Sequence, residues 1–231
     1  IFLEPFLFAY FNSKKDNLFS EIMLTEITQG YFIEKEPLLL KESFNNEGIA
    51  YVPNLGYFDK NGSKIDDILK IDAFEILKTS HPLLEKYFVE FYKGHIVNTN
   101  PNHNSVWEEN YKELEQAILI IKEHLPAFYK EFVLANKRIY LHDNPKILNF
   151  ASVETLGMLY FYILGKKNLI YFIEEIIHQA SHNYLYYVMF NKNEFFKIDS
   201  ENTIMRDLTK QDWDYRNLYG AFHGLYTVTR R

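Results

Sequence analysis

The feature that most constrains this fold is a change in the spacing of apolar residues after the polar segment VNTNPNHNS (97–105). From Trp107 to Leu125, apolar residues recur every three or four positions, and Ser105 with Glu108 forms a capping-box pattern, so we expect an amphipathic helix that Pro126 ends or kinks. Runs rich in β-branched and aromatic residues follow at RIYLHD (138–143), KILNFAS (146–152) and GMLYFYI (157–163). Together these patterns predict an α+β fold with a small mixed sheet.

The part before residue 105 has a different pattern. Residues 13–29 predict a helix that ends at Gly30, and residues 80–94 predict a second helix with Pro82 in its first turn. Between them, Pro53 and an Asn61-Gly62 turn indicate short extended pieces. We therefore expect a mostly helical N-terminal part, residues 1–104, packed in one compact unit with a second part, residues 105–231.

Composition limits the possible partners and ligands. The 231 residues are 47% hydrophobic and carry a net charge of −6 with no basic block, so we expect a globular protein that binds neither nucleic acid nor a membrane surface. Without cysteine, a metal would need His, Asp or Glu ligands, and a cytoplasmic location is expected. IFLEPFLFAYF at the start lacks the features of a signal peptide. Because the chain begins at Ile1 and ends in two arginines after an apolar segment, we expect a longer gene product.

The segment FIEEIIHQASHNYLYYV (172–188) places two histidines four residues apart in an apolar, helix-like run. His178 and His182 would share one helical face, as in the metal-binding helix of zinc metalloproteases, but Gln179 replaces the glutamate of His-Glu-x-x-His. The pair alone is a weak signal, since histidines on an apolar helix are also found as hydrogen-bonded core residues. The remaining histidines resemble surface, loop or capping residues: His81, His95, His103, His124 and His142.

Three blocks, in order, strengthen the metal hypothesis: SVETLGMLYFYI, LIYFIEEIIHQASHNYL and DWDYRNLYGAFHGLYTV. Over residues 138–231 they resemble the HExxH-motif peptide-modification family, the 2-oxoglutarate-dependent peptide β-hydroxylases of ribosomal peptide biosynthesis. Two positions depart from the family's pattern, Gln179 and Asn217, where a proline is expected after the arginine. The matching positions are Ser152, Glu175, His178, His182, Trp213, Asp214, Arg216, His223 and Gly224.

The resemblance implies a ligand set and a cosubstrate site. His178, His182 and His223 would bind Fe(II), for which zinc or nickel can substitute. Arg216 would anchor the distal carboxylate of 2-oxoglutarate, because a guanidinium matches a carboxylate with two parallel hydrogen bonds, and Ser152 and Tyr219 would add further bonds. From the residues alone, His223 could equally be an ordinary buried histidine, and Arg216 a surface arginine.

Gln179 bears on the reaction. A zinc peptidase needs a base beside the metal-bound water, and an amide has no useful proton affinity near neutral pH, whereas an iron oxygenase needs no such base. Gln179 could still orient a ligand or cosubstrate through its amide. We therefore expect an Fe(II)- and 2-oxoglutarate-dependent oxygenase (dioxygenase) that uses O2 to hydroxylate a side-chain β-carbon of a precursor peptide in natural-product biosynthesis. The alternatives are a zincin-like metallohydrolase, with its base elsewhere, and a catalytically decayed peptide-binding partner protein.

Overall fold

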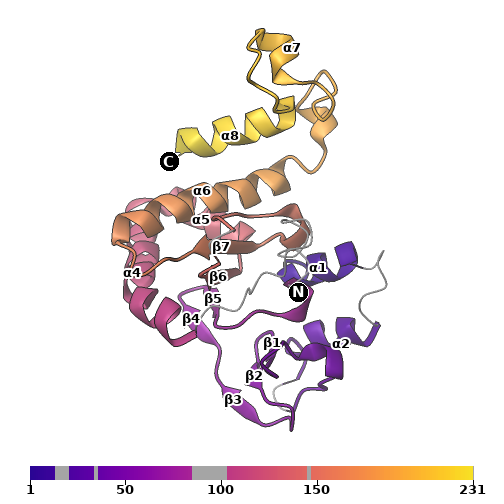
Figure 1. Ribbon diagram of the computed structural model, residues 1–231, viewed down its shortest axis with the longest axis vertical. Helices are drawn as coiled ribbons and strands as arrows, with labels where there is room; N and C mark the ends of the chain where they lie inside the picture. Colours follow the sequence, from indigo (N-terminus) through magenta and orange to yellow (C-terminus); the bar gives the residue numbers. More distant parts are fainter. Residues whose placement is uncertain (14–20, 34–35, 85–102, 145–146, 231) are drawn as a thin grey trace.

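The computed structural model describes residues 1–13, 21–33, 36–84, 103–144 and 147–230. These residues form helices, a three-stranded sheet and a four-stranded sheet (Figure 1), which confirms the predicted α+β class. No helix in these ranges is long and apolar enough to cross a membrane.

The N-terminal part combines two helices with a small antiparallel sheet. The helices are α1 (Pro5–Ser13) and α2 (Glu21–Gln29), followed by the 3-10 turn η2 (Lys41–Ser43). The sheet has the order β1 (Ala50–Val52), β2 (Gly56–Phe58) and β3 (Lys64–Asp66). The predicted turn joins β2 to β3: Gly62 has φ +78°, and Asp59 Oδ1 accepts hydrogen bonds from the Asn61 and Ser63 amides at 2.8 and 2.9 Å. The extended pieces and the turn expected there are confirmed.

The four-stranded sheet joins the two halves of the chain. Its order is β4 (Leu69–Ile71), β5 (Phe74–Leu77), β6 (Arg138–His142) and β7 (Met158–Tyr162). β4 and β5 are antiparallel, while β5–β6 and β6–β7 are parallel, so the sheet is mixed as predicted. Two of its strands precede residue 104. In the described part of residues 1–104, five short strands therefore accompany α1, α2, the helical residues 82–84 and the start of α4, and the expectation of a mostly helical region understated the strand content.

Two of the three strands predicted after residue 137 form, as β6 and β7, but KILNFAS does not. Residues 145–146 lie outside the described ranges, and Phe150 makes only an isolated bridge to Tyr160 before the 3-10 turn η3 (Val153–Thr155). The Asn149 side chain accepts hydrogen bonds from the Tyr162 amide at 2.6 Å and the Tyr171 hydroxyl at 2.9 Å. A side chain thus occupies a position that a paired strand's backbone would need, which ends the pairing.

Alternation along β6 and β7 divides the core into two layers. Ile139 and Leu141, with their neighbours on β7, pack against α4 (His103–His124), α5 (Pro126–Ala135) and α6 (Leu169–Val188). Tyr140 and Tyr160 face the other side, where α1, α2 and the small sheet lie. This is the two-residue period of a strand buried on both faces.

The predicted helix boundaries are partly correct. α2 ends before Gly30, and Pro126 separates α4 from α5, as expected. However, α4 begins at His103, so the predicted cap at Ser105 lies inside the helix. Most of the helix predicted at 80–94 lies outside the described residues.

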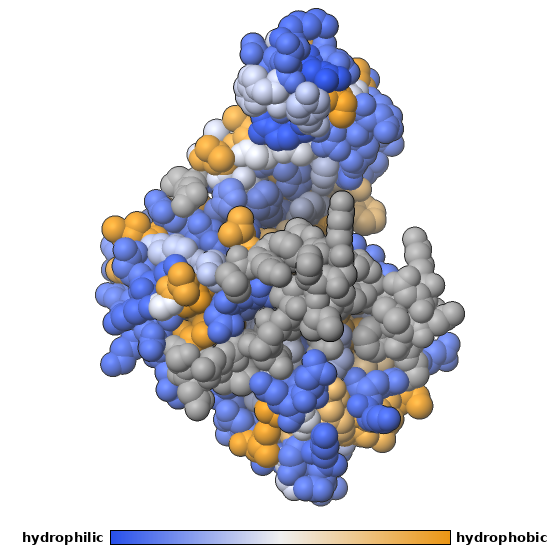
Figure 2. Space-filling model, viewed as in Figure 1, coloured by the Kyte–Doolittle hydropathy of each residue, from blue (hydrophilic) through white to orange (hydrophobic). Residues whose placement is uncertain are grey.

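The C-terminal segment adds a layer above α6. After the 3-10 turn η4 (Lys192–Glu194) and the short helix α7 (Met205–Thr209), α8 (Leu218–Arg230) lies against α6 on the side away from the sheet (Figure 1). The small sheet β1–β3 lies at the opposite end of the molecule. On the face shown in Figure 2, hydrophilic residues predominate and apolar residues form small separate groups.

A buried ionic cluster holds the start of the chain to the sheet. Arg138 on β6 is fully buried and forms ion pairs with Glu4, just before α1, and with Glu75 on β5. Its Nε lies 3.0 Å from the Tyr51 hydroxyl and 3.1 Å from Glu75 Oε2. The Tyr31 and Tyr51 hydroxyls donate to Glu4 and Glu75 at 2.5 Å. We call Arg138, Glu4, Glu75, Tyr31 and Tyr51 the arginine cluster.

Candidate metal centre

Helix α6 buries one face and presents its histidines on another. Asn168 caps its N-terminus by accepting a hydrogen bond from the Tyr171 amide at 2.8 Å. Phe172, Ile176 and Ala180 pack into the core, and Asn183 donates to the Met158 carbonyl at 2.9 Å. This anchoring fixes the rotation of α6 about its axis. The half-buried His178 and His182 lie on the side that α8 approaches.

Helix α8 supplies the third histidine. Asn217 Oδ1 accepts a hydrogen bond from the Gly220 amide at 2.7 Å, so Asn217 caps the start of α8. An asparagine at this position therefore has a structural role of its own, at the site where the family resemblance predicts proline. Five residues into α8, His223 is 5% exposed and faces α6.

Two imidazole nitrogens converge between the helices. His182 Nδ1 and His223 Nδ1 share a hydrogen bond of 3.3 Å whose donor depends on the tautomers, and the rings stack at 12° with centroids 5.6 Å apart. Two nitrogen ligands that share one tetrahedral metal at about 2.1 Å are separated by roughly 3.4 Å. His178 completes the group, with its ring centroid 5.0 Å from that of His182 and almost perpendicular to it. We call His178, His182 and His223 the histidine cluster.

The environment keeps two of these imidazoles neutral. Burial, together with neighbouring His178 and His223, lowers the pKa of His182 to about 4. Burial and the Lys192 ammonium lower the pKa of His223 to about 4, against the opposing effect of Glu201. Neutral imidazoles retain the lone pair that a metal requires.

The donor chemistry suits a metal, but the arrangement is incomplete. Within the described ranges, no three His, Asp or Glu side chains are placed so that one metal ion could contact all of them. His182 and His223 have the spacing of two ligands, whereas His178 lies beside them without converging on the same point. His223 Nε2 is buried and has no hydrogen-bond partner among the described residues. The structure therefore brings His182 and His223 to within hydrogen-bonding distance, and the three-histidine ligand set stays a prediction.

Gln179 follows His178 in α6 but has its own environment. It is 4% exposed, and its Nε2 donates a long hydrogen bond of 3.4 Å to Glu175 Oε2, one helical turn earlier. The amide is thus partly engaged within α6.

Arg216 lies just before α8 and is held by Asp214. Its Nε and Nη2 each donate to the Asp214 carboxylate at 2.8 Å, and its side chain is 57% exposed. The guanidinium lowers the pKa of Asp214. Nη1 forms no hydrogen bond within the described part of the chain and lies 3.8 Å from where a Cβ on Gly224 would sit. The edge formed by Nε and Nη2 is therefore already occupied by Asp214, and the donors that remain are Nη1 and the second N–H of Nη2.

The other predicted residues are divided between two regions. Tyr219 belongs with the histidines: its ring centroid lies 4.5 Å from that of His223, and burial raises its pKa to about 12. Ser152 caps η3 by accepting from the Glu154 amide, and η3 packs against α1, on the opposite side of the sheet from α6. Trp213 is 69% exposed. Of the predicted cosubstrate residues, Arg216 and Tyr219 thus lie on the α8 side of the molecule.

Sequence reasoning missed some neighbours of the cluster. Tyr186 lies 4.7 Å from His223 between ring centroids, and its place one turn after His182 was a signal that could have identified it. Lys192, whose Nζ lies 3.9 Å from the centre of the Tyr219 ring and pairs with Glu201, had no such signal. His81 and His142 were predicted to be surface, loop or capping residues, but both are buried. His81 stacks on Phe6, and its Nδ1 accepts from the Leu83 amide at 3.1 Å, which agrees with a capping role. His142 lies within β6.

Comparison with known proteins adds no assignment: no protein-family model matches this chain, and no curated protein matches it. The family resemblance therefore depends on the residues quoted above.

Proposed function

We propose that this protein is a cytoplasmic Fe(II)- and 2-oxoglutarate-dependent oxygenase that hydroxylates a side-chain β-carbon of a ribosomally made precursor peptide. The observation that carries the proposal is the 3.3 Å approach of His182 Nδ1 and His223 Nδ1. Two neutral histidines from separate helices meet at the spacing of metal ligands, with a third imidazole beside them.

In this proposal, His178, His182 and His223 hold the metal, and His178 joins the other two when metal binds. Fe(II), when bound with 2-oxoglutarate and O2, supplies the oxidation that places a hydroxyl group on a C–H bond, and 2-oxoglutarate becomes succinate and CO2. Zinc or nickel could occupy the same nitrogens without supporting this chemistry.

The surrounding residues have distinct roles in the proposal. Arg216 donates to the distal carboxylate of 2-oxoglutarate through Nη1 while Asp214 fixes the guanidinium plane. Tyr219 and Tyr186 pack against the His223 ring and limit its rotation. Gln179 helps to orient ligands through its amide, which donates to Glu175. Unlike a carboxylate at this position, the amide cannot act as a base for hydrolysis. Ser152 keeps a capping role and takes no part in cosubstrate binding.

Turnover tests the proposal. Protein purified without oxygen, loaded with Fe(II), is supplied with O2, 2-oxoglutarate and candidate precursor peptides encoded near its gene, and succinate is measured. We expect peptide-stimulated succinate that is lost in His223→Leu and retained in His124→Gln, a control at an exposed histidine on α4. Iron binding without succinate formation would contradict the oxygenase, and peptide cleavage with bound zinc would favour the metallohydrolase. Peptide binding without metal would favour a decayed partner protein.

A further inference from the structure

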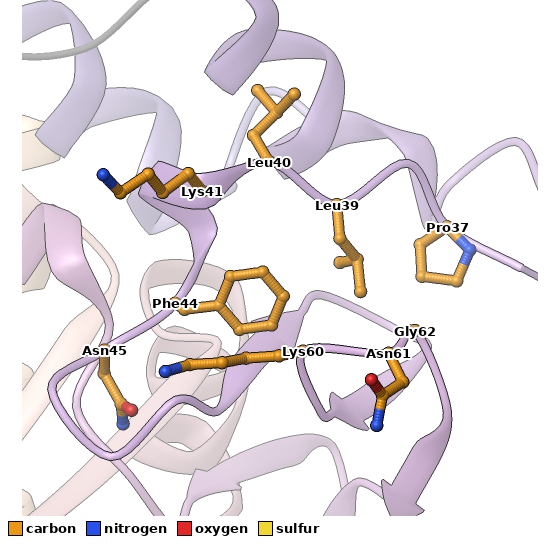
Figure 3. Close-up of a pocket in the computed structure, with 9 residues that line it drawn as sticks. All are labelled: Pro37, Leu39, Leu40, Lys41, Phe44, Asn45, Lys60, Asn61 and Gly62. Carbon is orange, nitrogen blue, oxygen red and sulfur yellow. The ribbon is translucent and has the colours of Figure 1, made fainter.

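A second candidate site lies in the N-terminal part, at the opposite end of the molecule from the histidine cluster (Figure 1). A cleft of about 740 Å³ separates the segment 37–45 from the turn between β2 and β3. One wall carries the apolar residues Leu39, Leu40 and Phe44, of which Leu40 points its side chain away from the cleft (Figure 3). In Figure 3, Leu39 and Phe44 point into the space between the two segments, the Lys60 stem runs beneath the Phe44 ring, and Asn61 lies across from them. We call this the lysine cleft.

The Gln29 side chain holds the backbone of the first wall in an extended conformation at Leu38. Gln29 Nε2 donates to the Leu38 carbonyl at 3.0 Å, and Gln29 Oε1 accepts from the Leu38 amide at 2.7 Å, as a neighbouring strand would. Ser43 Oγ accepts from the Leu40 amide at 2.7 Å. Between these anchors, the Leu39 amide and carbonyl form no hydrogen bond with any described residue. In an extended chain the backbone groups of successive residues point to opposite edges, so those of Leu39 face away from Gln29 and are open to another chain.

The rest of the cleft is equally well anchored. Asn45 Oδ1 accepts from the Glu47 and Ile49 amides at 3.0 Å each, which holds the turn after η2. The Lys60 stem lies across Gly48, where a Cβ would come within 2.6 Å of Lys60 Cε. Gly48, with φ +75°, therefore makes room for the lysine. A preformed cleft loses little entropy when a ligand binds.

Charge selects the ligand. Lys41 and Lys60 both line the cleft, and neither forms an ion pair within the described residues, although the whole chain carries a net charge of −6. Two cations beside an apolar wall complement a carboxylate next to a large apolar side chain, and the open Leu39 backbone complements another main chain.

We propose that the lysine cleft binds an extended peptide segment in which an acidic residue flanks a large apolar one. The apolar side chain packs against Leu39 and Phe44, the carboxylate lies near Lys41 and Lys60, and the Leu39 backbone pairs with the peptide. The site does not depend on the oxygenase reaction, because binding is measured without metal or turnover.

The test is selection of random dodecapeptides displayed on phage against the immobilised full chain, followed by affinity measurement on synthetic copies of the enriched peptides. Binding is compared with Lys41→Glu/Lys60→Glu. The matched control is Lys112→Glu/Lys130→Glu, which makes the same charge change at exposed lysines on α4 and α5.

We expect enriched peptides that share an acidic residue beside Leu, Phe, Ile or Trp. Their affinity should fall about tenfold or more in the cleft variant and stay within about twofold in the control. Absence of enrichment, enrichment of peptides without acidic residues, or equal losses in both variants would each overturn the proposal.

Discussion

The arginine cluster and the histidine cluster are both polar and largely buried. They differ in how many ion pairs and hydrogen bonds their side chains form within the cluster. Arg138 has two carboxylates and a tyrosine hydroxyl around it, and those carboxylates receive further tyrosine hydrogen bonds. Arg138 Nη2 forms no hydrogen bond with a described residue, but its charge is balanced by the Glu75 carboxylate at 3.0 Å. In the histidine cluster, His182 and His223 face each other, and His223 Nε2 has no partner among the described residues.

This difference distinguishes a polar cluster that stabilises the fold from one that can bind a ligand. A buried charge network whose members satisfy one another holds segments together, and it has little left to offer a ligand. In the histidine cluster one hydrogen bond joins His182 to His223, but His223 Nε2 is buried and unpartnered among the described residues, so this nitrogen is available to a ligand. The comparison predicts opposite responses to substitution.

The largest effect is expected from Arg138→Met. It leaves Glu4 and Glu75 buried without their cation, so the free energy of unfolding should fall by about 3–5 kcal/mol, measured by urea denaturation. Arg206→Met, which removes an exposed arginine 3.7 Å from Asp207, is the control and should change little. If the variant does not fold, Glu4→Gln, which keeps a hydrogen-bonding side chain, should give a smaller loss. A stability equal to wild type would remove the distinction between the clusters.

A third buried polar group, the Glu26 carboxyl, allows the comparison to be tested through the pH dependence of the free energy of unfolding. Burial raises the pKa of Glu26 from 4.5 to about 7, more than contact with Ser43 lowers it. The folded state thus prefers the protonated acid. Its stabilising contribution is full below pH 4.5 and is lost as pH rises towards 7, by roughly 2–3 kcal/mol. Unfolding measured across this range should show the loss in wild type, and Glu26→Gln should flatten it. An unchanged slope in the variant would show that another group is responsible.

A smaller effect is expected at the histidine cluster. In metal-free protein, His223→Leu replaces a buried imidazole that has an unpartnered nitrogen with an apolar side chain of similar size. The free energy of unfolding should change by less than about 1 kcal/mol. Urea denaturation in the presence of a chelator measures it. A loss as large as that of Arg138→Met would mean that the histidines, too, are structural.

The smallest effect on stability is expected from Arg216→Met, because this side chain is 57% exposed and pairs with a neighbour two residues away. The thermal midpoint should not move, whereas 2-oxoglutarate affinity in the metal-loaded protein should fall about tenfold. Calorimetry measures both, with Arg206→Met as the control. Unchanged 2-oxoglutarate affinity would remove Arg216 from the proposed site.

Local patterns explain what could be predicted. β6 and β7 were visible because their β-branched and aromatic residues are dense, and the pairing of His178 with His182 follows from helix geometry alone. β4 and β5 were missed because they are too short for periodicity, and Glu75 makes β5 look polar until Arg138 is placed beside it.

Interactions that depend on distant or irregular segments could not be predicted locally. The approach of His223 to His182 was expected only from the family resemblance. It requires the segment between α6 and α8 to reverse the chain so that α8 packs against α6. The Asp214–Arg216 pair depends on the backbone of that loop. For KILNFAS, composition favoured a strand, but Asn149 takes backbone hydrogen bonds with its side chain instead.

The most direct test of the central claim is stoichiometric metal binding by the full chain. Fe(II) is titrated anaerobically into metal-free wild type, His223→Leu and His124→Gln, with bound iron measured after gel filtration. We predict one tightly bound iron per chain in wild type and in His124→Gln, and none in His223→Leu. Wild type without bound iron, or His223→Leu with as much iron as wild type, would contradict the claim that α6 and α8 together form a metal site.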